Sequence, residues 1–310
     1  MSSLSTISAK ADFSEAVARR NCFTKPLFDA ANPFAAKLVC DITDNSVDAA
    51  IATIRRAAFK GADAFNLNVS LIDYGKLEDV GRIFVDVQMP VFTAVRRASF
   101  LPVYGGTPFA PRQQTDAERV EDHLRCLDYG SAGVDMELDT FHVDKGAQSR
   151  ANEIAAGVDQ ERADALGPIG DVSFDADAVE RQKDAIRQVK SRNGFVILST
   201  HTSRPINTAE VLLIARSAAE RGADYVKMVV RTRSQEDQDE LVRASLVLRR
   251  ESSIPFILMP MGHQTVATRL ALFTLGAGWA ITQAEFVPGG FHQQPLIDVW
   301  LPMIRALRAA

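Results

Sequence analysis

Residues 195–230, FVILSTHTSRPINTAEVLLIARSAAERGADYVKMVV, contain a strand, a helix and a second strand in close succession. The runs 195–201 and 223–230 are short and apolar, and the helical pattern between them ends at Gly222. Strands that alternate with helices of this length indicate βαβ units, in which the strands are parallel. The same alternation begins at residue 36 and continues to the end of the chain.

Eight such units follow one another. We expect strands at 36–42, 65–70, 89–96, 133–139, 195–201, 223–230, 255–261 and 279–283. We expect helices at 46–60, 77–84, 115–127, 175–192, 207–221, 234–250, 265–275 and 296–309. Eight strand–helix units within ~250 residues predict an α/β fold of the (β/α)8 TIM-barrel type. A doubly wound open sheet is the alternative, but no glycine-rich phosphate motif follows the first strand.

The barrel would occupy residues 36–310 as a single domain, preceded by an N-terminal arm at 1–35. The segment 140–174 is an insertion, because loops between a strand and its helix are usually ~2–6 residues long. Such a loop could cover an active site or form a peripheral or oligomerisation surface, and the sequence leaves both open.

The composition is that of a soluble globular protein: of 310 residues, 46% are hydrophobic and 24% charged, with a net charge of −4. No stretch approaches the ~18 apolar residues of a membrane span, so we expect no membrane partner. The mixed charges predict no nucleic-acid partner. Three cysteines argue against a disulfide framework. With no apolar signal segment, the chain is expected to be cytoplasmic.

Two of the expected strands, 65–70 and 133–139, alternate apolar and polar residues. If their apolar side chains pack on the helices, the polar ones face into the barrel, where buried charges require partners or a use. An edge strand with one wet face is the alternative. The inward set would be Asn66, Asn68, Ser70, Asp135, Glu137 and Asp139.

Lys227 stands inside the apolar run 223–230. Lysine is seldom buried unless it is paired or functional. A desolvated, neutral amine can attack a ketone to form a Schiff base, whose protonated imine withdraws electrons from the neighbouring carbon. A snorkelling side chain or an ion pair would explain an isolated lysine equally well.

His201 and Arg269 are further candidates. His201 ends its strand with the inward parity, and histidine can shuttle protons near neutral pH, although a structural histidine is an equal alternative. Arg269 could bind a substrate carboxylate or be a solvated helix charge. His263, in the turn before Arg269, is interpreted as a loop residue.

Asp135 and Glu137 are the natural carboxylate partners for His201 or Lys227, unless they form a salt bridge inside the barrel. No HExxH motif or paired-cysteine spacing is present, so no metal is expected. Mg²⁺ on the acidic strand remains a minor alternative.

These stretches together resemble the type I 3-dehydroquinate dehydratase family. The similar segments are 197–201, 223–230, 259–262 with Thr268 and Arg269, and 135–138. They occur in the family's order, with 26 residues from His201 to Lys227 and 42 from Lys227 to Arg269. The similarity covers roughly 36–140 and 178–309 and is strongest in the second half.

The resemblance implies a (β/α)8 barrel, a homodimer and a class I Schiff-base mechanism without a cofactor. Lys227 would form the imine with a ketone. His201 would assist imine formation, remove the α-proton and help expel the β-hydroxyl as water. Asp135 would position His201, Arg269 would hold the substrate carboxylate, and Arg96 would line the active site.

The sequence also departs from the family pattern. Asn66 and Asn68 stand where the family has a glutamate and an arginine that bind substrate hydroxyls. Tyr104 replaces a glutamate before a Gly-Gly pair, and Gln293 or Gln294 would have to substitute for a displaced closing glutamine. We count these residues and Glu137 as substrate-binding candidates, and expect the same reaction class with an altered substrate.

The leading hypothesis is a lyase that removes water from a β-hydroxy ketone bearing a carboxylate, either 3-dehydroquinate or a related polyhydroxy keto acid. A class I aldolase using the same lysine imine is the enzymatic alternative. A non-catalytic dehydroquinase-like regulator that binds the keto acid is the alternative from another class.

Overall fold

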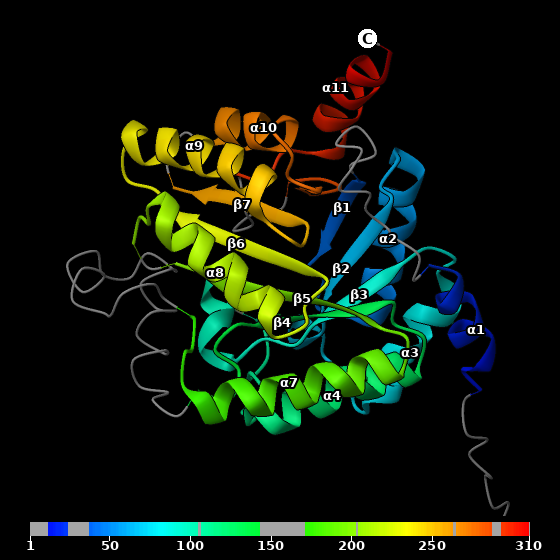
Figure 1. Ribbon diagram of the computed structural model, residues 1–310. Helices are drawn as coiled ribbons and strands as arrows, with labels where there is room; N and C mark the ends of the chain where they lie inside the picture. Colours follow the sequence, from blue (N-terminus) through cyan, green and yellow to red (C-terminus); the bar gives the residue numbers. More distant parts are fainter. Residues whose placement is uncertain are drawn as a thin grey trace, which may run out of the picture.

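The computed structural model describes residues 12–23, 37–104, 107–142, 171–202, 204–262, 265–286 and 293–309. Their centre is a parallel eight-stranded sheet in the order β7-β6-β5-β4-β3-β2-β1-β8, surrounded by helices (Figure 1). The strands are β1 (Lys37–Ile42), β2 (Ala64–Asn68), β3 (Val91–Ala94), β4 (Gly133–Glu137), β5 (Phe195–His201), β6 (Tyr225–Arg231), β7 (Phe256–Met261) and β8 (Trp279–Thr282).

The two ends of this sheet order come together, so the barrel is nearly closed. Just before β8 begins, the N–H of Gly278 donates to the carbonyl of Phe256 at the start of β7, over 2.9 Å. The predicted (β/α)8 barrel is confirmed, and the open doubly wound sheet is wrong.

Except for α1, which lies in the segment predicted to be an arm, the helices lie close to their predicted ranges. They are α1 (Ser14–Phe23), α2 (Val47–Lys60), α3 (Leu77–Asp86), α4 (Asp116–Asp128), α7 (Ala176–Ser191), α8 (Thr208–Glu220), α9 (Gln235–Glu251), α10 (Val266–Thr274) and α11 (Ile297–Ala309). Local chemistry sets several of these boundaries. A capping box begins α4, since Thr115 accepts from the Glu118 N–H and Glu118 accepts from the Thr115 N–H.

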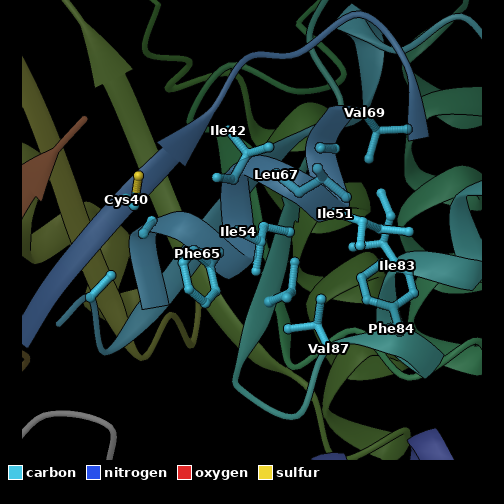
Figure 2. Close-up of a cluster of buried hydrophobic side chains, with 14 of the residues drawn as sticks. Cys40, Ile42, Ile51, Ile54, Phe65, Leu67, Val69, Ile83, Phe84 and Val87 are labelled. Atoms are coloured by element: carbon cyan, nitrogen blue, oxygen red, sulfur yellow. The ribbon is translucent and has the colours of Figure 1, made fainter. Parts of the chain in front are cut away.

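The outward faces of the first strands pack on the helices. Figure 2 shows Phe65, Leu67 and Val69 in one apolar cluster with Ile54 of α2 and Ile83 of α3. The alternation in β2 therefore has the predicted sense, and its asparagines are on the inner face.

An aromatic cluster fills the barrel at the amino ends of the strands. Trp279 lies 5.1 Å from Phe92 and 5.3 Å from Tyr225 between ring centroids, and Phe92 lies 5.5 Å from Phe195. Each of these residues is the first or second of its strand. Polar inward residues consequently begin one layer higher, toward the carboxyl ends.

Helix α1 lies within the segment predicted to be an arm and packs beside α3 (Figure 1). Its buried Arg20 donates through Nη1 to the carbonyl of Leu127 over 2.8 Å, at the end of α4. Gly130 allows this packing, because a Cβ there would lie 2.8 Å from Cβ of Ala16. Residues 1–11 and 24–35 of this segment are outside the described residues.

Two further expectations from the sequence, the insertion and the absence of a membrane span, can be compared with the described residues. Of the predicted insertion, residues 140–142 and 171–174 are described, while its remainder lies outside the described residues. Over the described ranges, no helix combines the length and apolar character that a membrane crossing needs.

Candidate active site

Lys227 lies on the inner face of β6, above the aromatic cluster. It is paired in register with Ser199 of β5 and is 5% exposed. Its Nζ donates to Oδ2 of Asp135 over 2.9 Å. The predicted pairing of Lys227 with a strand-four carboxylate is therefore present.

Asp135 is the centre of a buried charge cluster. Its Oδ2 also faces Nη2 of Arg96 at 2.8 Å, and its Oδ1 accepts from the Ser199 hydroxyl at 2.5 Å. Burial by itself would raise the pKa of Asp135, but Arg96 and Lys227 together bring that pKa well below its usual range. Asp135 is thus an anion that faces two cations.

Glu137 lies one inward position above Asp135, at the carboxyl end of β4. Its two oxygens face Nη1 of Arg96 at 3.0 Å and Nη1 of Arg119 at 2.8 Å. Burial opposes ionisation, yet Arg119, Arg96 and Arg97 lower the pKa of Glu137 well below its ordinary value. With both oxygens paired, Glu137 holds Arg96 in place. Its predicted role in substrate binding stays a prediction.

The polar face of β4 is not a wet edge. The strand pairs with β3 on one side and β5 on the other, and its two acidic side chains are buried, as is a third two residues beyond its end. The third, Asp139, accepts hydrogen bonds from Nη1 of Arg97 on both of its oxygens, each over 3.0 Å. Burial raises the pKa of Asp139 to about 7 against the effect of Arg97, and nearby Asp171 adds to the rise.

His201 is buried at the end of β5, two residues beyond Ser199. It is therefore on the same inner face as Lys227 and ~6.6 Å nearer the rim. Its Nδ1 is 3.0 Å from Oδ2 of Asp171, and the Phe100 ring lies 4.5 Å away between centroids. Oδ1 of Asp171 accepts from the His201 N–H.

The predicted partner of His201 was therefore wrong. Asp135 directs its oxygens to Lys227, Arg96 and Ser199, whereas Asp171 contacts the imidazole. Sequence reasoning missed Asp171 because it lies near the end of the predicted insertion 140–174, where no periodic pattern of the sequence distinguishes one acidic residue from another.

Arg269, on α10, points back beneath the end of β7. Its Nε donates to the carbonyl of Pro260 over 3.0 Å, and its Nη1 is buried without a hydrogen-bond partner among the described residues. Burial lowers the pKa of Arg269 to about 10, an effect that Asp41 opposes. The guanidinium remains charged at neutral pH and can receive an anion.

A second polar group lies over β1 and β2. Asp41 accepts from Nδ2 of Asn66 at 2.7 Å and from Nε2 of Gln294 at 2.9 Å. Asn68 is completely buried, and neither of its side-chain heteroatoms has a partner within the described part of the chain. Asn66 and Gln294 therefore both donate to Asp41, whereas Asn68 has no such contact.

The remaining candidates are less informative. Gln293 accepts from the N–H of Gly262 over 3.2 Å. The side chain of Tyr104, like His263, lies outside the described residues. In the described ranges, no group of three or more His, Cys, Asp or Glu side chains is arranged to hold a metal ion. The acidic residues of β4 instead face guanidinium and ammonium groups.

The fold and the site define a (β/α)8-barrel protein with a buried lysine–carboxylate–arginine cluster at the carboxyl ends of its strands. Residues 169–291 match the model of the type I 3-dehydroquinase family. That segment contains β5 to β8 and with them His201, Lys227 and Arg269. The match confirms, over this part of the chain, the resemblance seen in the sequence.

Curated relatives agree with the family match. The chain is 35% identical over 136 residues to a 3-dehydroquinate dehydratase of Geobacillus kaustophilus, and 31% identical over 118 residues to that of Geobacillus thermodenitrificans. These matches cover 43% and 37% of this chain and 52% and 46% of the relatives. The chain therefore spans about half the length of the curated relatives that it matches.

Solved structures show that the shared fold extends further than the sequence similarity. The crystal structure of the Geobacillus kaustophilus enzyme superposes with a TM-score of 0.67 at 19% identity, covering 88% of this chain and 91% of that one. The type I enzyme of Clostridium difficile gives a TM-score of 0.66 at 16% identity, covering 88% and 92%. At these identities the comparison establishes the barrel fold.

Proposed function

We propose that the chain is a Schiff-base-forming dehydratase that removes water from a β-hydroxy ketone carrying a carboxylate. The observation that carries this proposal is the buried contact of Lys227 with Asp135, one inward position below His201. A lysine and a histidine on one face of neighbouring strands can act on the same small substrate.

The first step uses Lys227. Its ammonium group releases a proton, and the neutral amine then attacks the ketone. The resulting carbinolamine takes up a proton as its hydroxyl leaves as water, which gives the imine. Protonation of the imine nitrogen places a positive charge beside the Asp135 carboxylate, which already balances the lysine ammonium. The chemistry requires no cofactor, because the protonated imine itself accepts the electron pair of the next step.

The second step uses His201. The imidazole removes the proton from the carbon next to the imine carbon, and the electron pair of that bond moves into the iminium system. As the pair returns, the β-hydroxyl leaves and takes a proton from the histidine, so that one water is released. Hydrolysis of the imine then frees the enone and Lys227.

Arg269 and the asparagines would determine which substrate binds. The unpartnered Nη1 of Arg269 would receive the substrate carboxylate. Over β2, Asn66 and Asn68 offer neutral amides instead of charges. We therefore propose that the substrate presents neutral polar groups there, and that 3-dehydroquinate is the first compound of the panel to test. The proposal includes the homodimeric state that the resemblance implies and the cytoplasmic location expected from the sequence.

Borohydride trapping tests the proposal. The protein is incubated with 3-dehydroquinate and related β-hydroxy keto acids, reduced with sodium borohydride and examined by intact mass and peptide mapping. We expect a stable adduct on Lys227, its loss in Lys227→Met, and an unchanged adduct in the exposed-lysine control Lys190→Met. The products also discriminate the reactions, because a dehydratase yields an enone and an aldolase yields two carbonyl fragments. Failure of every keto acid to leave an adduct would contradict the imine mechanism.

A further inference from the structure

We infer that Asp171, and not a strand-four carboxylate, is the residue that positions His201 for proton transfer. This inference rests on the proposed function for the reaction, but its structural basis is independent of the substrate. The carboxylate binds the residue twice: Oδ2 lies 3.0 Å from Nδ1 of the imidazole, and Oδ1 accepts the backbone N–H of His201. Oδ1 also accepts the Thr200 hydroxyl over 2.9 Å.

The strand-four carboxylates are already occupied. Asp135 uses Oδ1 for Ser199 and Oδ2 for Lys227 and Arg96. Glu137 is paired on each oxygen with an arginine. Asp171 is therefore the carboxylate that the described structure offers to the imidazole.

The segment that carries Asp171 is held firmly. Arg221, at the end of α8, donates through Nη2 to the carbonyl of Ser173 and through Nη1 to that of Leu138 over 2.6 Å. The Ser173 hydroxyl lies 2.9 Å from Nδ1 of His142. Asp171 is 1% exposed, so its contact with His201 is screened little by solvent. A fixed, buried carboxylate can hold an imidazole in one orientation.

This contact determines which ring nitrogen carries out proton transfer. A carboxylate accepts a hydrogen bond from Nδ1–H, so the ring proton is held on Nδ1. Nε2 is then the nitrogen that exchanges protons with the substrate. Asp171 also stabilises the imidazolium that forms when His201 takes the α-proton. The end of the predicted insertion 140–174 thereby contributes a residue to the site.

Asp171→Asn is the decisive variant, because its amide keeps the size of the side chain. With Oδ1 still bound to the two donors, the amide nitrogen would face Nδ1 of His201 and donate to it, which places the imidazole proton on Nε2. We expect the long-range ¹⁵N–¹H spectrum to show Nδ1–H for His201 in the unaltered protein and Nε2–H in the variant. His201→Gln identifies the signal among the five histidines.

The kinetic expectation is a loss of kcat of about 10²- to 10⁴-fold with KM changed little, because the wrong tautomer cannot accept the α-proton through Nε2. Asp171→Glu should recover part of the rate, and the exposed control Asp177→Asn should leave it unchanged. The borohydride adduct on Lys227 should still form in Asp171→Asn, since the lysine and Asp135 are intact.

The outcomes separate the two proposals. If the unaltered protein forms no adduct and no enone, the proposed function fails, while the tautomer spectrum still tests Asp171. If Asp171→Asn turns over normally and keeps Nδ1–H, the positioning role is overturned. Should that variant not fold, the spectrum of the unaltered protein decides, because an Nε2–H tautomer there contradicts the contact.

Discussion

Among single residues, Asn68 departs most clearly from ordinary packing. Its amide is completely buried, and both heteroatoms lack partners among the described residues. A buried polar group without a hydrogen bond costs about 1–3 kcal/mol relative to one that is satisfied. Such a cost is expected where a side chain forms its hydrogen bonds only when a ligand is bound, which agrees with the proposed role of Asn68 in substrate recognition.

Replacing Asn68 should therefore stabilise the fold and reduce the proposed activity. We expect Asn68→Leu to raise the free energy of unfolding by about 1–3 kcal/mol, because a side chain of similar size replaces the unsatisfied amide. The same variant should lose most of its turnover of the identified keto acid. Chemical denaturation and steady-state kinetics measure the two effects, with the partnered Asn66→Leu as the control that should lose stability. A decrease in stability in Asn68→Leu would refute the interpretation.

At the scale of elements, helix α4 packs on the barrel through polar as well as apolar groups. Arg119 reaches inward to the carbonyl of Val95 at 2.7 Å and to Glu137 at 2.8 Å. One turn further along, His123 places Nδ1 3.0 Å from the Thr93 hydroxyl of β3. This helix therefore supports the charge cluster from outside the barrel.

Burial makes His123 a source of acid sensitivity. Desolvation, aided by the Arg119 charge, lowers the pKa of His123 from 6.5 to about 3. The unfolded chain therefore binds a proton at this histidine at higher pH than the folded protein does. Its stabilising contribution is complete above pH 6.5 and is lost as the pH falls from there toward 3, at no more than about 1.4 kcal/mol per pH unit.

His123→Gln should reduce the dependence of the free energy of unfolding on pH. We expect the variant to be less stable than the unaltered protein at pH 7.5, because its contact with Thr93 is altered, and the difference to shrink or reverse by pH 5. Urea denaturation across this pH range measures the change, with the pH 7.5 value as the internal reference. A difference that stays constant with pH would contradict the assignment.

Across the whole molecule, the barrel is layered from one end to the other. Helix α1 lies against the ends of α3 and α4, the aromatic cluster fills the amino ends of the strands, and the charge cluster of Asp135 follows above it. The apolar lower layers provide a rigid base, so the costly buried charges are confined to the end where the candidate site lies.

Docking of α1 should contribute measurably to global stability. We expect Arg20→Ala to lower the free energy of unfolding by about 1–3 kcal/mol, because the carbonyl of Leu127 loses a buried, charge-assisted donor. The exposed neighbour Cys22→Ser should change it by less than about 0.5 kcal/mol. Thermal and urea denaturation compare the two variants. A loss of unfolding free energy in Arg20→Ala no larger than that in Cys22→Ser would contradict the prediction.

The sequence by itself determined the barrel and the inward residues of its strands. Strand and helix periods are local properties of the chain, so the eight units and the inner faces of β2 and β4 could be predicted. Parity likewise placed His201 on the inner face of its strand, and the register of Ser199 with Lys227 in the structure puts the lysine on that same face.

The tertiary structure alone decided which charges meet. Asp171 contacts His201 although it lies 30 residues earlier in the chain, and Asp135 contacts Lys227 and Arg96 instead. Helix α1 was hidden for a similar reason, because it is stabilised by contacts such as Arg20 with Leu127 rather than by a strong pattern of its own. Periodicity fixes the face on which a side chain lies, but its partner depends on distances that are set when loops and layers pack together.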